Sequence, residues 1–480
     1  MKKNLFNICL IAVIALAASS CKKIIEQTPS NTIYREGYWQ TEQDANTALA
    51  GTYARLRVVL NQSNRHYYYG DIPADVFASF AGDLSFLPNV AQGVYTESYQ
   101  DVLRDWRPFY KISALANLVI EKVPQIPEAA FRTGGAATRD QIVGEALFIR
   151  ALTYFYLTRI WGDVVYVTAV EKDTQSEPNQ PKTKKEVVLA GCIKDLVEAA
   201  AKLEYGYASA ANRAVRANKG SANALLAHIY AWTGDYENAE KAANEVITNG
   251  GYSLLPISQM PSLFSGKSAE SIFEIEFESS NNEGNAGGIA SVLLVDPYIR
   301  NKTNAWFIDQ NKLQEIYGDT TSSTKDKRVA AWFERSGNNV FSKKYSDVFY
   351  KDATNFADVR FDDNIVIFRL SDIMLLRAEA LSKLNRFGEA RPLLDAVRAR
   401  AGLDPSTASD AQLYDEVFNE RCRELFLEGH KYWDMLRTKH FPSHLTDAEY
   451  SQGAHLWPIQ KEIFLDNNVL TQNEYWISRY

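Results

Sequence analysis

The feature that most constrains the fold of this chain is an internal repeat. The segment HIYAWTGDYENAEKAANEVI (228–247) aligns without gaps with EALSKLNRFGEARPLLDAVR (379–398). Each copy reads as a helix, a turn containing Gly or Asn, an aromatic residue and a second helix. Ala239 and Ala390 occupy the position where the second helix would cross the first. Small residues at helix crossings are typical of tetratricopeptide-like pairs, which stack into a superhelical scaffold.

Apolar residues recur at helical spacing through most of the chain and predict a mostly α fold. Period-two alternation in IFEIEF (272–277) and NIVIFRL (364–370) predicts a few short strands, whereas 171–185, 279–305 and the tail 441–480 are expected to be irregular. We expect helices over 41–60, 105–123, 138–161, 186–203, 218–233, 236–248, 371–384, 387–400 and 411–437. The helix over 138–161 is apolar on more than one face, which predicts that other elements cover it on both sides.

The amino terminus has the layout of an export signal. Lys2 and Lys3 precede a short apolar run (8–18), and small residues lead to Cys21. The run is too short to span a bilayer as a helix. We interpret 1–20 as a lipoprotein signal peptide and Cys21 as a lipid anchor. The alternative is an ordinary signal followed by an incidental cysteine.

Charge and cysteine content exclude several classes of protein. The chain carries 52 Lys and Arg against 59 Asp and Glu, without a long basic run, which argues against a nucleic-acid surface. Cys192 and Cys422 lie in helical patterns and are expected to be buried free thiols. His440 and His444 have helical spacing but are separated by Pro442, so we expect no metal site there and no cofactor.

The sequence contains no nucleophile elbow, phosphate-binding loop or zinc-protease motif. Glu420, Glu424 and Glu428 would lie on one face of the predicted helix 411–437. Stacked carboxylates can raise one another's pKa and so provide a general acid. The alternative is that nearby arginines pair with them and clamp the helix to its neighbours, and we favour it.

Aromatic residues are concentrated in two polar stretches that interrupt the helical pattern. Exposed rings in such stretches suit carbohydrate, because sugar C–H faces stack on aromatic surfaces while polar side chains bond the hydroxyl groups. Burial in a helix interface is the alternative for each ring, and for any single ring we favour it. The candidate ligand-binding residues are Tyr67, Tyr69, Asp83, Phe86, Tyr95, Tyr99, Tyr298 and Trp306.

Blocks along the whole mature chain resemble the SusD/RagB family of outer-membrane lipoproteins. They are CKKIIEQTPSN after the signal, GEALFIRALTYFYLTRIWGDV, the repeat around TGDYENA, FRLSDIMLLRAEAL, ARPLLDAVRARAGL, ERCRELFLEGHKYWDMLR and HLWPIQKEIFLDNN. The resemblance implies that 21–480 form a single SusD-like domain. Within it, 21–135 would carry a variable ligand loop, 136–250 and 371–437 the tetratricopeptide-like helices, 251–370 an insertion with short strands, and 438–480 a tail.

The resemblance also implies a binding protein, not an enzyme. Family members bind oligosaccharides, or peptides in RagB-like members, and deliver them to a SusC-like TonB-dependent transporter in the outer membrane. Insertions comparable to 62–110 and 279–310 build the ligand surface. The side chains of Arg377, Glu379, Arg423, Glu424 and Trp433 would then be architectural. We expect a lipid-anchored, surface-exposed glycan-binding protein; peptide capture and a glycoside hydrolase are the alternatives.

Overall fold

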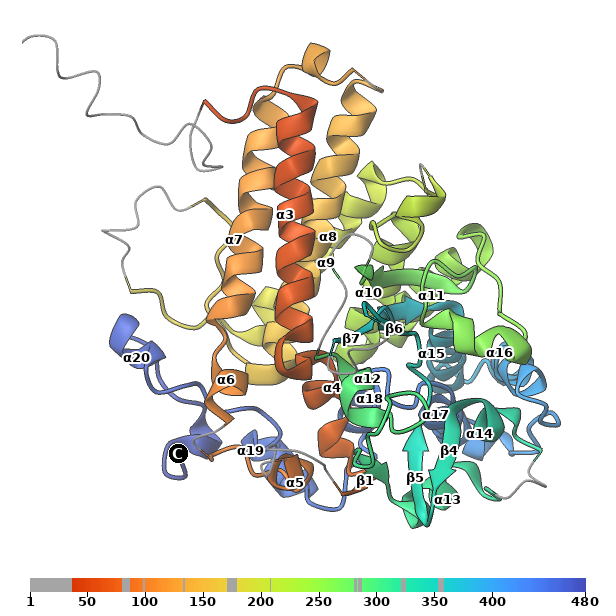
Figure 1. The fold of residues 1–480 in the computed structure, drawn as a ribbon. Coiled ribbons are helices and arrows are strands. Elements are labelled where there is room, and N and C mark those ends of the chain that lie inside the picture. Colours follow the sequence, from red (N-terminus) through yellow and green to blue (C-terminus); the bar gives the residue numbers. More distant parts are fainter. Residues whose placement is uncertain are drawn as a thin grey trace, which may run out of the picture.

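The computed structural model describes residues 37–79, 87–97, 100–132, 134–170, 179–207, 209–279, 283, 287–320, 325–352 and 358–480. Cys21, Asp83, Phe86 and Tyr99 therefore lie outside the described residues, as does most of the polar loop predicted over 171–185. Helices dominate, and strands are few and short, as the hydrophobic periodicity predicts (Figure 1).

The first half of the chain forms a row of upright helices. They are α3 (Glu42–Asn61), α7 (Arg107–Lys122), α8 (Ala136–Trp161) and α9 (Lys185–Lys202). A capping box at Thr41 starts α3, because its hydroxyl accepts the Asp44 N–H while the Asp44 carboxylate accepts the Thr41 N–H. Helix α8 is buried continuously from Ile142 to Trp161 and packs against α3, α7 and α9 (Figure 1). The prediction that this helix is covered on both sides is confirmed.

The repeated segments form two helix pairs. The first pair is α10 (Lys219–Thr233) with α11 (Tyr236–Asn249), and the second is α15 (Leu370–Lys383) with α16 (Phe387–Arg400). Ala239 and Ala390 are fully buried where the helices of each pair meet. Helix α9 packs on α10, and α11 packs on α15. The helices therefore continue as one array from the upright row to the second pair (Figure 1), which is the tetratricopeptide-like scaffold that the repeat predicts.

The prediction of one long helix over 411–437 is wrong. The structure has α17 (Leu413–Glu424) and α18 (Lys431–Thr438), separated by a turn in which Leu427 and Gly429 have positive φ. Side chains that are distant in the sequence form hydrogen bonds with the backbone of this turn. Tyr345 donates to the Leu427 carbonyl, and the Asp71 carboxylate accepts the Gly429 N–H. The helix ends here because these tertiary hydrogen bonds replace the hydrogen bonds within the helix. The hydrophobic periodicity of the sequence does not indicate them.

Within the described residues, the strands form three small sheets. The two predicted strands pair with each other, antiparallel, as β2 (Ser271–Ile275) and β8 (Ile365–Arg369). A four-stranded sheet has the order β1–β3–β5–β4. Its members are β1 (Phe77–Ser79), β3 (Phe307–Ile308), β4 (Phe333–Ser336) and β5 (Asn339–Ser342). A hairpin joins β6 (Val348–Tyr350) to β7 (Val359–Phe361).

Short helices fill the remaining segments. In the amino-terminal half they are α4 (Arg65–Gly70), α5 (Leu87–Ala91) and α6 (Asp101–Arg104). The predicted irregular stretch 279–305 contains α12 (Ile289–Leu293), and α13 (Gln310–Tyr317) and α14 (Lys327–Trp332) follow it. The tail holds α19 (Asp447–Gln452) and α20 (Ile463–Asp466). Among the described helices, none combines the length and the apolar character that crossing a membrane requires.

Candidate functional site

Two segments that are far apart in the sequence meet in the four-stranded sheet. Phe77 of β1 pairs with Ile308 of β3, and the Asp309 N–H donates to the Val76 carbonyl at 3.0 Å. The sheet thus joins the segments 62–110 and 279–310, which the family resemblance assigns to the ligand surface. Trp306 lies between them: its ring stacks on Tyr68 at 5.6 Å and meets Phe77 edge-on.

Four of the predicted ligand-binding rings are buried. Tyr67, Tyr69, Tyr95 and Trp306 expose at most 2% of their surface. Tyr95 stacks on Trp457 of the tail at 4.4 Å, and the Tyr69 hydroxyl donates to the Leu103 carbonyl. For these four rings, the structure bears out the burial alternative. Tyr67 and Tyr69 lie on α4, Tyr95 lies in the segment that follows α5, and Trp306 directly precedes β3. Other parts of the protein cover each ring.

Tyr298 is the one described candidate whose ring reaches the surface. It is half-buried, and its hydroxyl donates to Glu334 Oε2 at 2.9 Å. Burial, followed by the hydrogen bond and charge of Glu334, raises the pKa of Tyr298 to about 12, so the hydroxyl stays protonated at neutral pH. Its ring meets Phe341 of β5 nearly perpendicularly, at 6.1 Å.

Residues that the sequence interpretation did not select lie beside Tyr298. The Arg300 N–H donates to the Tyr350 hydroxyl at 2.9 Å, and the Arg300 guanidinium lies 4.6 Å from the centre of the Tyr350 ring. The neighbouring Phe349 is 46% exposed on strand β6. The short apolar run VFY between polar residues was the available signal. We call Tyr298, Arg300, Glu334, Phe349 and Tyr350 the Tyr298 surface.

A separate hollow of about 500 Å³ lies between α8 and the loop that follows α9. Tyr205 and Tyr207 line it together with charged groups such as Lys202 and Asp140, which form an ion pair at 2.9 Å. It shares no residue with the Tyr298 surface. It therefore provides an independent reference when the binding role of the Tyr298 surface is tested.

The three stacked glutamates are buried in a network of ion pairs. Arg328 Nη1 lies 2.7 Å from Glu420 and 3.0 Å from Glu424, and Arg369 Nε lies 2.7 Å from Glu428. Burial alone would raise the pKa of the Glu424 carboxyl, but Arg400, Arg369 and Arg328 outweigh it and hold this pKa well below its usual range. A general acid needs the opposite shift. The clamp alternative is therefore confirmed for these carboxylates.

The remaining residues named from the sequence also form internal contacts. Arg377 pairs with Glu240 at 2.8 Å, and Glu379 pairs with Arg437. Trp433 is buried beneath the Arg159 guanidinium. Cys192 and Cys422 are buried free thiols, as predicted. His440 stacks on Phe418 and pairs with Asp415.

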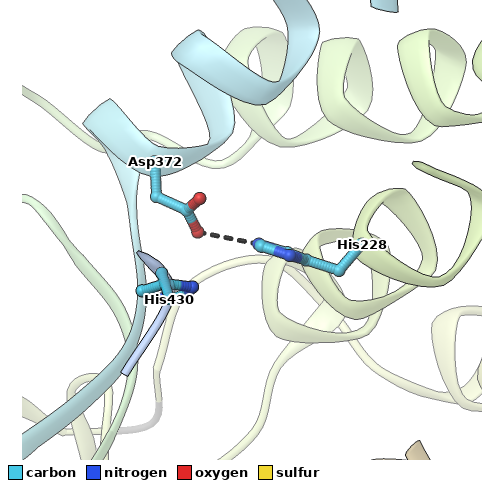
Figure 2. A group of neighbouring side chains, drawn as sticks. All are labelled: His228, Asp372 and His430. Carbon is cyan, nitrogen blue, oxygen red and sulfur yellow. Dashed lines mark hydrogen bonds and ion pairs between the residues drawn. The ribbon is translucent and has the colours of Figure 1, made fainter. Parts of the chain in front are cut away.

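One group of described side chains has the composition of a metal-binding site (Figure 2). His228, Asp372 and His430 each place a ligand atom within 4.8 Å of the other two, and all three are buried. Burial, with further repulsion from His228, lowers the pKa of His430 to about 3. The sequence interpretation missed this group, because its members are far apart and share no motif spacing.

Comparisons with known proteins give one consistent family. The sequence model described as the SusD family matches residues 294–476, and a second, described as starch-binding and associating with the outer membrane, matches residues 24–231. A SusD-like protein of Formosa agariphila is 26% identical over 98% of this chain and 99% of its own length.

Solved structures agree with the fold described above. A crystal structure of a SusD superfamily protein from Bacteroides thetaiotaomicron is 27% identical, with a TM-score of 0.79 over 91% of this chain and 99% of that chain. A structure described as a laminarin-binding SusD-like protein is 21% identical, with a TM-score of 0.74 over 92% of this chain and all of that chain.

Proposed function

Because this chain belongs to the SusD-like family, we propose that it is a lipoprotein of the outer membrane that binds oligosaccharides at the cell surface. It passes them to a SusC-like TonB-dependent transporter and performs no chemistry on them. The lipid on Cys21 anchors it. The description of one matching family model, starch-binding and associating with the outer membrane, supports both the ligand class and the location.

The observation that carries the proposal is the joining of two insertions beside an exposed aromatic surface. The pairing of β1 with β3 brings the segments 62–110 and 279–310 together, and the Tyr298 surface adjoins the second of them. Phe349 and Tyr350 supply rings on which a sugar face stacks, and Arg300 and Glu334 supply a donor and an acceptor for hydroxyl groups. The chemistry there suits a neutral oligosaccharide.

The buried glutamate network supports capture without hydrolysis. A glycosidase needs two carboxyl groups on opposite sides of the scissile bond, with one of them able to hold a proton. Glu420 and Glu424 share Arg328, have no exposed surface and are held as carboxylates. In this proposal they stabilise the fold.

Binding to an immobilised panel of polysaccharides and peptides tests the proposal. We expect retention on one class of glycan, with no shortened product released. Phe349→Ala and Tyr350→Ala should each weaken that binding about tenfold, which corresponds to about 1.4 kcal/mol. Tyr205→Ala, in the separate hollow, is the matched control and should bind like the parent protein.

The other outcomes have distinct meanings. Retention on peptides alone would replace glycan capture by RagB-like peptide capture. Loss of glycan binding in Tyr205→Ala, with normal binding in Phe349→Ala and Tyr350→Ala, would move the ligand site to the hollow beside α8. Release of shortened glycans by the parent protein would overturn the assignment as a binding protein.

A further inference from the structure

We propose that His228, Asp372 and His430 form a binding site for a divalent transition-metal ion of the zinc type. Two imidazoles and a carboxylate are a ligand set that Zn²⁺ accepts, with water completing four-fold coordination. The three ligand atoms already lie within 4.8 Å of one another. This site is separate from the Tyr298 surface, and the proposal does not depend on the identity of the transported ligand.

The fold delivers the three side chains from three elements. His228 lies in α10, Asp372 lies in the first turn of α15, and His430 immediately precedes α18. Figure 2 shows the His228 imidazole directed at the Asp372 carboxylate, with the His430 ring below that carboxylate in this view. Helices α10 and α15 are the first helices of the two repeated pairs. The site therefore lies where the two repeats meet the carboxy-terminal part of the chain.

His430 is the member of the group whose ring nitrogens are available to a ligand. Its side chain is 8% exposed, and its ring nitrogens form no hydrogen bond with any described residue. Its ring stacks on that of His228 at 5.6 Å, with an angle of 28° between the planes. Because these nitrogens are not committed to a protein partner, an ion shared with His228 and Asp372 can bind the ring without breaking a hydrogen bond of His430.

The surroundings already hold the other two ligands in place. Asp372 Oδ1 accepts a hydrogen bond from Arg421 at 2.9 Å, which leaves Oδ2 directed at His228 Nε2, 2.8 Å away. Arg421 is in turn fixed by Asp434 at 2.8 Å. The His228 ring also packs on Phe368 at 5.0 Å. Hydrogen bonds from outer groups to a ligating carboxylate are a regular feature of metal sites, because they set its orientation.

Metal binding replaces the hydrogen bond between His228 and Asp372. His228 Nε2 would lose its proton to solvent while Nδ1 keeps or takes up one proton, so a neutral imidazole and the Asp372 carboxylate would face the ion. Metal–ligand bonds of about 2.0–2.2 Å would require the ligand atoms to approach to about 3.3 Å of one another, closer than the present limit of 4.8 Å. Arg421 keeps its bond to Oδ1, so Asp372 binds through one oxygen.

The test uses the purified protein after chelation and desalting. We expect Zn²⁺ to be retained at one ion per chain by elemental analysis and to raise the melting temperature. Co²⁺ should give the visible absorption bands of four-coordinate nitrogen and oxygen ligation. His430→Gln should bind Zn²⁺ at least tenfold more weakly, whereas the control His440→Gln should bind it like the parent protein.

Three results would overturn the proposal. They are failure of the parent protein to retain Zn²⁺ or Co²⁺, equal retention by His430→Gln, and loss of retention in His440→Gln with His430→Gln unaffected. The melting temperature of His430→Gln in chelator should match that of the parent, which separates loss of metal from loss of folding. If this variant does not fold, the Co²⁺ spectrum of the parent protein decides.

Discussion

Single aromatic residues in this protein have one of two roles, and exposure separates them. Tyr68, Trp306 and Phe77 form an internal stack that joins the two insertions, whereas Phe349 is exposed and Tyr350 is half-buried. The same residue type is therefore structural in one place and available to ligand in another. Neighbours along the sequence do not distinguish the two cases, because the covering groups come from distant segments.

Trp306→Ala should destabilise the fold. Removing a fully buried indole leaves a cavity and should lower the free energy of unfolding by about 3–5 kcal/mol. Chemical denaturation measures this change. Tyr298→Phe is the control: it removes one hydroxyl from a half-buried ring and should cost about 1 kcal/mol or less. A Trp306→Ala protein of parental stability that fails to bind glycan would instead place this ring in the ligand site.

Glu424→Gln should make the protein less stable at neutral pH and less sensitive to acid. Arg369 and Arg400 would lose a buried carboxylate, at a cost of about 3–5 kcal/mol. The folded-state pKa of Glu424 lies below its unfolded value. The contribution of Glu424 to the free energy of unfolding is therefore present above about pH 5. It is lost as the pH falls toward the folded-state pKa.

Urea unfolding between pH 7 and pH 3 measures both effects. The stability of the parent should fall with pH more steeply than that of Glu424→Gln. Glu237→Gln removes an exposed partner of Lys241 and should change stability by less than about 0.5 kcal/mol at any of these pH values. Equal pH dependence of the parent and Glu424→Gln would show that the network is not held together by this charge.

At the scale of elements, close backbone contacts decide where helices end. Gly70, at the end of α4, lies against the turn between α17 and α18: a β-carbon there would lie 2.1 Å from the Gly429 carbonyl oxygen. This contact, with the bonds to Leu427 and Gly429, interrupts what periodicity predicts as one helix. Local sequence favours helix through 425–430, and tertiary bonds outweigh that preference.

Gly70→Ala should destabilise the protein, because its methyl group would force α4 and the turn apart. We expect a loss of about 1–3 kcal/mol, typical of overpacking. The matched control is Gly51→Ala in the exposed middle of α3, where nothing lies within 4 Å of the added carbon. That change should stabilise by about 0.5–1 kcal/mol, because alanine favours helix. Equal effects of the two changes in thermal unfolding would contradict the predicted contact.

At the scale of the whole molecule, the helix pairs, the sheet and the anchor would serve one task. In the proposed function, the scaffold of α9, α10, α11, α15 and α16 holds the insertions in place, and the insertions bind the ligand. A lipid anchor then keeps the binding surface beside the membrane, where a transporter partner can receive the ligand.

Cys21→Ala should release the protein from membranes into the soluble fraction, because the lipid would be its attachment. Cell fractionation followed by immunoblotting measures this change. Cys9→Ala, within the predicted signal peptide, is the control and should leave the protein with the membrane fraction. Membrane attachment of Cys21→Ala would contradict the lipoprotein prediction.

The sequence alone determined the parts of this protein that depend on local pattern. Periodicity located α3, α7 to α11, α15 and α16 and both strands of the β2–β8 pair, and the repeat at 228–247 and 379–398 identified the scaffold. These features are predictable because each helix must bury an apolar stripe, and the residues of that stripe recur at a fixed spacing in the sequence. The same reasoning anticipated the buried thiols and the arginine clamp on Glu420 and Glu424.

Only the tertiary structure decided which side chains are available for function. Tyr67, Tyr69, Tyr95 and Trp306 look like surface rings in the sequence and are buried, whereas Phe349 was not selected and is exposed. The sequence also did not predict the turn after Glu424 or the grouping of His228, Asp372 and His430. The physical reason is the same in each case: exposure, helix ends and side-chain clusters depend on contacts between distant segments, which no local spacing encodes.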